Sequence, residues 1–220
     1  MKYPFALYNE GLARAPIFPG LQGDPFVADL SRQNLLLDEI DVRDQRRFQN
    51  ILAEQMKPHY TWGFSGYLER RDSLLRSCPQ MVTQQRFYHL GLDIIVACGS
   101  RLHSPLQAVV VQTGYEAGEG NYGGFVLLQH RIDGARPFYS FYGHLSRREL
   151  PDTDRRLRAG EAFATIGDFH ENGNWFYHTH LQVITEAGLE RGYIDKGYCA
   201  AADLPEINDL CPSPLPLFLR

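Results

Sequence analysis

Histidines at even spacing are the residues of this sequence with the clearest chemical potential. His178 and His180 lie two apart in Trp175–Thr185, a stretch whose composition is typical of a β-strand. In a strand, side chains two apart point to the same face, roughly 6–7 Å from each other, and Gln182 would join this face. Two imidazoles on one face can serve one metal site, one as a ligand and one beside the metal-bound water. The alternative is a pair of solvated histidines, because the motif is short.

A second evenly spaced set occurs earlier, in the segment His-Leu-Gly-Leu-Asp that begins at His89. If this segment is a strand, His89, Gly91 and Asp93 share one face and the two leucines point into the core. A glycine between the two polar residues leaves room for a third ligand to approach. The alternative for this pair is a simple ion pair.

Together the two sets fit one divalent cation. Two neutral imidazoles and one carboxylate, from His89, Asp93 and His180, would fill three positions of a tetrahedral Zn²⁺ and leave the fourth for water or a substrate oxygen. One carboxylate leaves the centre with a charge of about +1, so it remains a Lewis acid. His144 ends another predicted strand, where an imidazole can protrude over a cleft and hold a proton or an oxyanion.

Composition limits what kind of protein presents these groups. The chain has 220 residues, of which 44% are hydrophobic and 22% charged, which is typical of one large globular domain or a domain with an appendage. A net charge of −4 argues against nucleic acid as the main partner. No apolar run approaches the roughly 20 residues of a membrane span, and the first twenty residues lack the apolar core of a secretory signal. A cytoplasmic location is therefore the default expectation.

The elements that position the candidate residues fall into three regions: an extended and helical segment over 1–80, a β-rich domain over 81–200 and an extended proline-rich tail over 201–220. In the first region, residues 1–28 should be extended and Ser31–Met56 should form one or two amphipathic helices with Ser31 as N-cap. A short helix should follow from about Gly66 to Ser77 and end at Pro79. Five strands, which suggest a sandwich or barrel, are predicted at Leu90–Val96, Ala108–Gln112, Phe125–Ile132, Pro137–Leu145 and Trp175–Thr185.

The remaining reactive side chains receive structural interpretations. Cys98 lies in an apolar run and is expected to be a buried thiol. Cys199 and Cys211 are expected to be free, although they could form a disulfide in an oxidising compartment. His130 is expected to be structural or to support a metal ligand. Three histidines are expected at the surface, namely His59, His103 and His170.

In their order along the chain, these motifs resemble the lysostaphin/LytM-type zinc metallopeptidase family. The resemblance covers about Arg86 to Thr185, nearly half of the chain. Its finer details are similar to the stand-alone or aminotransferase-fused branch of that family, on Gly66 to Arg70, Ile166 to Asp168 and Glu171 to Trp175. The motifs that carry the main resemblance are His-x-Gly-x-Asp from His89, Ser104-Pro105, Tyr122-Gly123-Gly124, His130, Tyr142-Gly143-His144-Leu145-Ser146, Gly160, Gly167 and His178-x-His180.

The resemblance implies a mainly β fold, a barrel-like β-sandwich of the LytM type (a duplicated hybrid motif) with the N-terminal helices packed on it. It implies a zinc metallo-endopeptidase that hydrolyses short peptide links, such as those of bacterial cell-wall cross-bridges, with a metal-activated water. By position, His89, Asp93 and His180 are the zinc ligands, and His144 and His178 hold and deprotonate the water or stabilise the oxyanion. The partner would be a peptide or peptidoglycan-like substrate, and family members are often exported. The sequence indicates no oligomeric state.

Some residues depart from the family pattern and keep a second interpretation open. Thr179 stands where Leu is usual, Phe176 and Tyr177 replace a small residue and Pro, and Gly124 stands where Asn is common. A zinc-retaining domain that binds a peptide or protein without cutting it fits these departures. A phosphocarrier with two facing histidines would not need Asp93, and a cupin-type site would need a histidine after position 180. The N-terminal helices should pack on the sandwich, or alternatively cover the groove.

Overall fold

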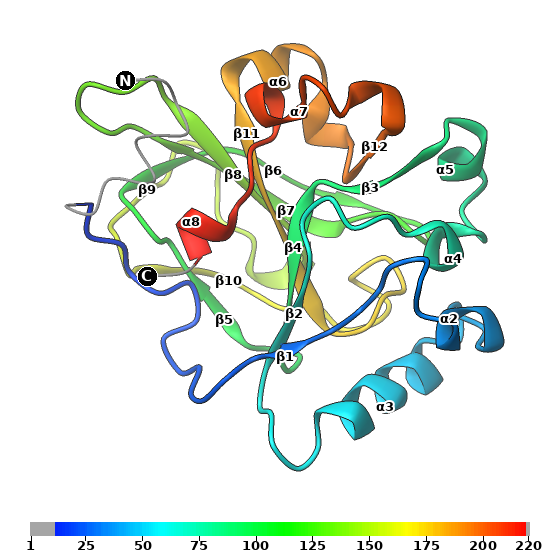
Figure 1. The fold of residues 1–220 in the computed structure, drawn as a ribbon. Helices are drawn as coiled ribbons and strands as arrows, with labels where there is room; N and C mark the ends of the chain where they lie inside the picture. The colour runs from blue at the N-terminus through cyan, green and yellow to red at the C-terminus, as the bar shows by residue number, and fades with distance from the viewer. Residues whose placement is uncertain (1–11, 219–220) are drawn as a thin grey trace.

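The computed structural model describes residues 12–218 and is built around one large mixed sheet of eight strands (Figure 1). The two N-terminal strands pair in parallel and all other pairs in the sheet are antiparallel. In spatial order the strands are β1 (Phe26–Val27), β2 (Gly63–Ser65), β4 (Gly91–Ile95), β11 (His178–Thr185), β8 (Phe138–Leu145), β7 (Gly123–His130), β6 (Ala108–Glu116) and β9 (Arg156–Leu157).

The large sheet does not close into a barrel among the described strands, so only the mainly β part of the expected barrel-like sandwich is confirmed. Strands β1 and β9 lie at its two edges and are not paired with each other among the described residues. Two smaller two-stranded sheets accompany it, one of β5 (Arg101–His103) with β10 (Ala162–Thr165) and one of β3 (Arg86–His89) with β12 (Tyr198–Ala200). The mainly β prediction holds, while the sandwich does not close on itself.

The central strands bury side chains on both faces. In β7, Val126 and Leu128 belong to one core cluster, whereas Phe125 and Leu127 belong to another on the opposite face. Alternation of this kind follows from the two-residue period of a strand. Because both faces are covered, polar groups that point from β4 or β11 are removed from water and need partners.

Helices are short and are not confined to the N-terminal segment. The longest is α3 (Gln45–Met56), and its N-cap is Asp44, whose side chain accepts a hydrogen bond from the Arg47 amide at 3.1 Å. No helix among residues 12–218 is both long enough and apolar enough to cross a membrane. The others are α2 (Leu36–Glu39), α4 (Asp72–Leu75), α5 (Pro79–Thr83), α6 (Glu186–Glu190), α7 (Ile207–Leu210) and α8 (Leu215–Phe218), with 3₁₀ turns at Arg147–Glu149, Tyr193–Asp195 and Ala201–Asp203.

Several predicted boundaries were wrong. Ser31 caps a turn, not a helix, because its Oγ accepts the Gln33 amide at 3.1 Å and the first helix starts only at Leu36. Most of Gly66–Ser77 is not helical, and only α4 forms there. Pro79 starts α5, since a proline is tolerated in the first turn, where its missing N–H leaves no bond unmade.

The C-terminal tail also differs from the prediction of a purely extended chain. Helices α7 and α8 form in it, with Pro212 and Pro214 between them and Pro216 in the first turn of α8. Proline forbids only the helix interior, so one-turn helices fit between these positions. The first eleven residues of the predicted extended segment lie outside the described residues.

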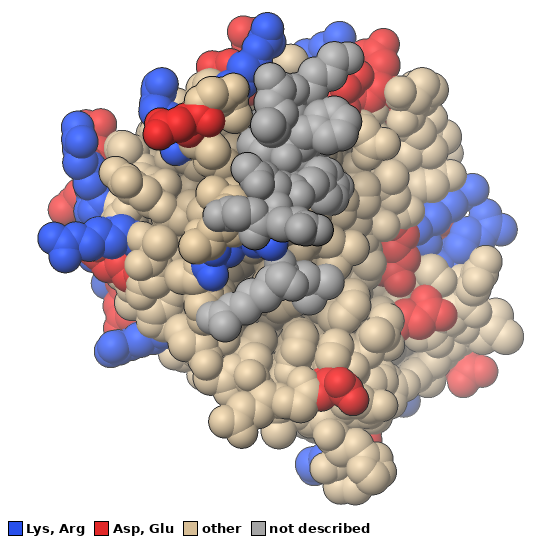
Figure 2. Space-filling view, turned by 60° about the vertical axis from the view of Figure 1, so that its left-hand side comes forward, with Lys and Arg blue, Asp and Glu red and all other residues tan. Residues whose placement is uncertain are grey.

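Basic and acidic side chains are interspersed on the face shown in Figure 2, where blue and red groups alternate along one edge. The arginine-rich stretch from Arg147 to Arg158 contains Glu149 as well as Asp152 and Asp154. Arg155 pairs with Glu161 at 2.9 Å. On this face the charges are therefore mixed.

Candidate functional site

Strand register brings the predicted ligands together. Asp93 of β4 lies opposite His180 of β11 on one side and opposite Ser65 of β2 on the other. Residues in register across neighbouring strands share a face, so these three side chains form a row across the sheet. His89 joins the row from the end of β3. The sequence predicted one continuous strand here, but β3 ends at His89 and β4 starts at Gly91, with Leu90 between them.

Gly91 provides the space that the sequence suggested. A Cβ at this position would lie 2.6 Å from Cε1 of His180 and 2.6 Å from the carbonyl oxygen of Leu181. Both approaches are far shorter than van der Waals contact, so a side chain at position 91 would displace the His180 ring. The glycine is therefore required by the close approach of His180.

Three ligand atoms face one another at the centre of the site. His89 Nε2 lies 2.9 Å from His180 Nδ1 and 3.2 Å from Asp93 Oδ1, and His180 Nδ1 lies 3.3 Å from Asp93 Oδ1. A tetrahedral zinc with bonds of about 2.0–2.1 Å has ligand-to-ligand edges of about 3.3–3.4 Å. The observed triangle is close to one face of such a tetrahedron. In a search of residues 12–218 for His, Cys, Asp and Glu side chains close enough to share a cation, His89, Asp93 and His180 form the group that is found.

The other side of each ligand is already engaged. His89 Nδ1 donates to the Gly66 carbonyl at 2.9 Å, and His180 Nε2 donates to Gln182 Oε1 at 3.0 Å. These partners assign the protons, so the nitrogens that face each other carry lone pairs. Two lone pairs 2.9 Å apart beside a carboxylate repel without a cation between them. The donor set therefore fits a divalent metal such as zinc.

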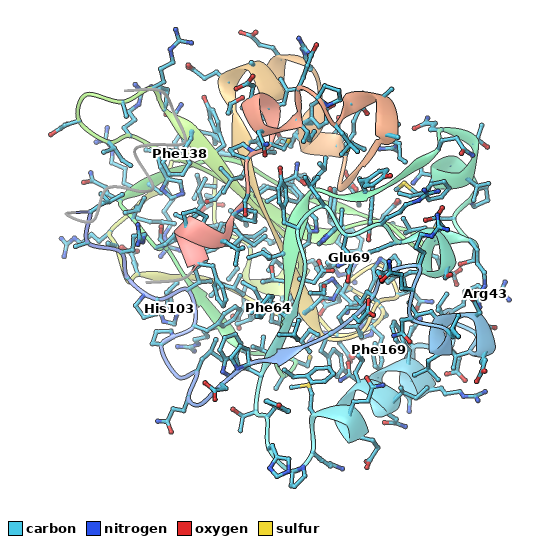
Figure 3. The ribbon with its side chains drawn as sticks, viewed as in Figure 1. Arg43, Phe64, Glu69, His103, Phe138 and Phe169 are labelled. Carbon is cyan, nitrogen blue, oxygen red and sulfur yellow. The ribbon has the colours of Figure 1, made fainter. Side chains whose placement is uncertain are left out.

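A buried ion network holds the second oxygen of Asp93. Arg71 Nη1 donates to Asp93 Oδ2 at 2.6 Å, and the hydroxyl of Ser65 donates to the same oxygen at 3.1 Å. Arg71 Nε also donates to Glu69 at 2.8 Å (Glu69 is labelled in Figure 3). Burial disfavours the Asp93 carboxylate, but its electrostatic interactions with His89 and with the Arg71 guanidinium outweigh this effect and hold its pKa well below the usual range. Oδ1 alone is left for a cation.

Two further imidazoles lie beside this centre. The rings of His144 and His178 are 4.3 Å apart, and His178 Nε2 lies 3.6 Å from Asp93 Oδ1. Their Nδ1 atoms donate to the carbonyls of Asn172 (2.7 Å) and Phe176 (2.8 Å), which leaves both Nε2 atoms with lone pairs. Burial lowers the pKa of His178 to about 4 and that of His144 well below its usual value. Both are neutral at pH 7 and can accept a proton.

The backbone conformation at His144 is one that few residues adopt, and it sets the direction of the imidazole ring. Its φ of +63° lies in the left-handed region, which non-glycine residues rarely adopt. Gly143 precedes it, and a Cβ there would lie 2.7 Å from the Tyr122 ring. The turn that ends β8 is thus set by a glycine and one strained residue, a combination found at functional sites.

A cleft opens beside three of the four imidazoles. A narrow cavity of about 60 Å³ is lined by His144, His178 and His180 together with Tyr122 and Tyr198. A larger one of about 460 Å³ shares lining residues with it, including Trp175. The walls of the larger cavity include Val42 and Arg43 from the N-terminal segment, and Arg43 is labelled in Figure 3.

Of the remaining predictions, some agree with the structure and one was wrong. His130 is buried and bonds Ser140 Oγ (2.7 Å) and the Gln107 carbonyl (3.2 Å), which agrees with a structural role. Cys98 is exposed, not buried, because the strand ends at Ile95 and Cys98 lies in the turn that follows. Cys199 and Cys211 are both buried and both free.

Some functional contacts were not found from the sequence. Gln182 was expected on the face of His180, but its hydrogen bond to the imidazole was not. Nothing in the sequence singled out Arg71, whose guanidinium is only 1% exposed, or Ser65. Asn172 lay in a motif of the resemblance, yet its carbonyl bond to His144 depends on a turn that no pattern predicts.

Comparison with known proteins agrees with this geometry. The model of peptidase family M23 matches residues 87–190, a little under half of the chain, so the chain is similar to that family over this range. A search of curated proteins found no match.

Solved structures of two peptidases resemble parts of the chain. A zinc-containing peptidase from Vibrio cholerae is 19% identical, with a TM-score of 0.37, over 44% of this chain and 27% of that one. The catalytic domain of the antimicrobial peptidase lysostaphin from Staphylococcus simulans is 18% identical, with a TM-score of 0.40, over 55% of this chain and 80% of that one. The chain thus spans about a quarter of the Vibrio protein.

Proposed function

We propose that this chain is a zinc-dependent metallo-endopeptidase that hydrolyses short peptide links. The proposal is supported above all by the three lone-pair atoms of His89, Asp93 and His180, which lie within 3.3 Å of one another with no proton between them. A site that binds cations only for stability would have a fourth protein ligand. Here the side beyond the triangle opens to the cleft.

The roles of the side chains follow from their free atoms. When bound, zinc supplies Lewis acidity, which lowers the pKa of a coordinated water and polarises a substrate carbonyl. His144 and His178 present neutral Nε2 atoms to the cleft and would take the proton of the attacking water. The same nitrogens, once protonated, would stabilise the oxyanion or protonate the leaving amine.

The substrate class is the finer part of the proposal. The resemblance of the motifs points to short peptides such as cell-wall cross-bridges, and two cavities that share lining residues lie at the site. The alternative is a domain that retains zinc and binds a peptide without cutting it. The neutral bases beside the metal triangle favour hydrolysis, because a binding module has no need of two lone pairs at the open position.

Metal analysis of variants tests the assignment. Asp93→Asn and His180→Ala should each lose zinc, measured by elemental analysis, because each removes one corner of the triangle. His144→Ala should keep zinc and lose turnover on a panel of muropeptides and glycine-rich peptides, measured as new amines. His170→Ala, at an exposed site, is the matched control. Equal zinc loss in all three site variants would refute the roles, and a silent zinc-loaded wild type would favour the binding module.

A further inference from the structure

The strand that carries His178 and His180 is entered through a short segment, Trp175 to Tyr177, that other parts of the chain hold in place. The backbone amide of Tyr177 donates to Oε1 of Gln49 at 2.7 Å. Gln49 lies on α3, 128 residues away in the chain. This segment directly precedes β11, and Tyr177 has no β4 partner in the ladder, which starts at His178. The Gln49 side chain thus replaces a strand partner at the point where the ladder ends.

Aromatic contacts connect the same helix to the imidazole. The Phe48 ring packs edge-on against Phe176 with centroids 5.3 Å apart, and Phe176 stacks on His178 at 4.2 Å with an angle of 21°. Phe48 and Phe176 are both buried in one cluster with residues of the N-terminal segment. Three rings therefore run in series from α3 to the site.

The Phe176 carbonyl is the acceptor that fixes the proton of His178 on Nδ1, at 2.8 Å. The position of Phe176 therefore sets both the tautomer and the plane of the His178 ring. Any shift of Phe176 away from α3 would move the acceptor and the stacking partner together. The Nε2 lone pair would then no longer be directed at the cleft.

We propose that α3 is a positioning element for His178, acting through Gln49 on the Tyr177 amide and through Phe48 on the Phe176 ring. The inference rests on the proposed function, in which His178 handles the proton of the attacking water. It extends the catalytic apparatus beyond residues 87–190, the range that matches the peptidase family, to a helix at 45–56. Misplacement of a reacting group by about 1 Å can lower a rate on the order of a hundredfold.

Gln49→Ala is the decisive variant, since the side chain is partly exposed and its loss leaves the core intact. Its kcat should fall at least about tenfold, with KM within about twofold and zinc content unchanged. Gln49→Glu should restore most of the rate, because a carboxylate also accepts the Tyr177 N–H. Gln55→Ala, the same substitution at an exposed position of the same helix, should match the wild type.

Two readouts do not depend on turnover. In Gln49→Ala the Tyr177 amide should exchange with solvent at least about tenfold faster by NMR, because its acceptor is gone. The ¹⁵N signature of the His178 ring in the zinc-loaded protein should change from a proton on Nδ1 alone to a tautomer mixture. These measurements decide the inference even if no peptide in the panel is cleaved.

The proposal is overturned by a Gln49→Ala enzyme whose kcat lies within twofold of the wild type, or by an unchanged exchange rate at Tyr177. An equal loss of rate in Gln55→Ala would also overturn it, since the effect would then be a general one of the helix surface. If the wild type cleaves nothing, faster exchange together with mixed tautomers supports the positioning role, and the proposed function fails separately.

Discussion

Replacing Gln182 with methionine should loosen zinc binding without touching any ligand. Gln182 is fully buried on β11. Its Oε1 accepts the Nε2–H of His180 at 3.0 Å, and its Nε2 donates to the Tyr193 carbonyl at 3.2 Å and to Cys211 Sγ at 3.4 Å. Methionine has a similar length and fills the space, but it offers no comparable acceptor or donor.

The magnitude follows from what each partner loses. Without its acceptor, the His180 ring no longer has a fixed tautomer, and loss of such a partner typically costs 10–100-fold in metal affinity. That range equals about 1.4–2.8 kcal/mol at tenfold per 1.4 kcal/mol. The buried N–H of His180 is also left without a partner, and the Tyr193 carbonyl keeps only the Lys196 amide, at 3.4 Å. The free energy of unfolding of the zinc-free protein should therefore fall by about 1–3 kcal/mol.

Competition against a chromophoric zinc chelator at pH 7.5 measures the affinity, and urea denaturation of the metal-free protein measures the stability. Gln112→Met, at an exposed position of strand β6, is the matched control and should change neither quantity. A Gln182→Met protein that binds zinc within twofold of the wild type would refute the reasoning that Gln182 orients His180. A loss of stability alone would mean that the amide supports only the fold.

Two further predictions concern the pH dependence of stability at His130 and the space around Gly91. Burial lowers the pKa of His130 from 6.5 to about 4, so His130 stays neutral in the native protein at pH values where it is protonated in the unfolded chain. The free energy of unfolding should therefore be unaffected above pH 6.5 and should fall by about 3 kcal/mol as the pH is lowered toward 4. His130→Gln should reduce this fall in urea titrations at several pH values, and a slope equal to that of the exposed-site control His59→Gln would contradict it. Gly91→Ala should lose zinc by elemental analysis, because the new Cβ would lie 2.6 Å from the His180 ring, whereas Gly20→Ala, with open space around it, should retain it.

The metal triangle could be predicted from the sequence because it depends on a simple period. Side chains two apart in a strand share a face, so the sequence predicted one face for His89, Gly91 and Asp93 and another for His178 and His180. In the structure His178 and His180 lie on one strand, whereas His89 ends β3 and Asp93 lies on β4. The pairing of β4 with β11 then needed only one register, the one that puts Asp93 opposite His180. Burial of both faces of the sheet fixes that register strongly, since a slip by one residue would move the polar side chains of β11 into the apolar cluster on the other face and its leucine toward the polar row.

The partners of the triangle could not be predicted in the same way. Arg71 and Glu69 are charged residues next to a short helix, where a solvent-exposed position is the usual outcome. Arg71 is buried and Glu69 is partly buried, with 13% of its side chain exposed, because the Oδ2 side of Asp93 takes a cationic partner only after the strands have assembled. Contacts such as Gln49 to Tyr177 likewise join residues more than a hundred positions apart, and no local pattern encodes them.

The buried ion network also explains how the site keeps the charge that its proposed chemistry needs. Asp93 alone would leave a bound dication with about one positive charge. Arg71 adds a positive charge in direct contact with Asp93, and Glu69, on the far side of the guanidinium, cancels it. If Arg71 stood without Glu69, it would compete with the cation for the carboxylate. If Glu69 stood without Arg71, the second carboxylate would weaken the Lewis acid. Together, Arg71 and Glu69 anchor Oδ2 of Asp93, leave Oδ1 free and add no net charge to the proposed metal site.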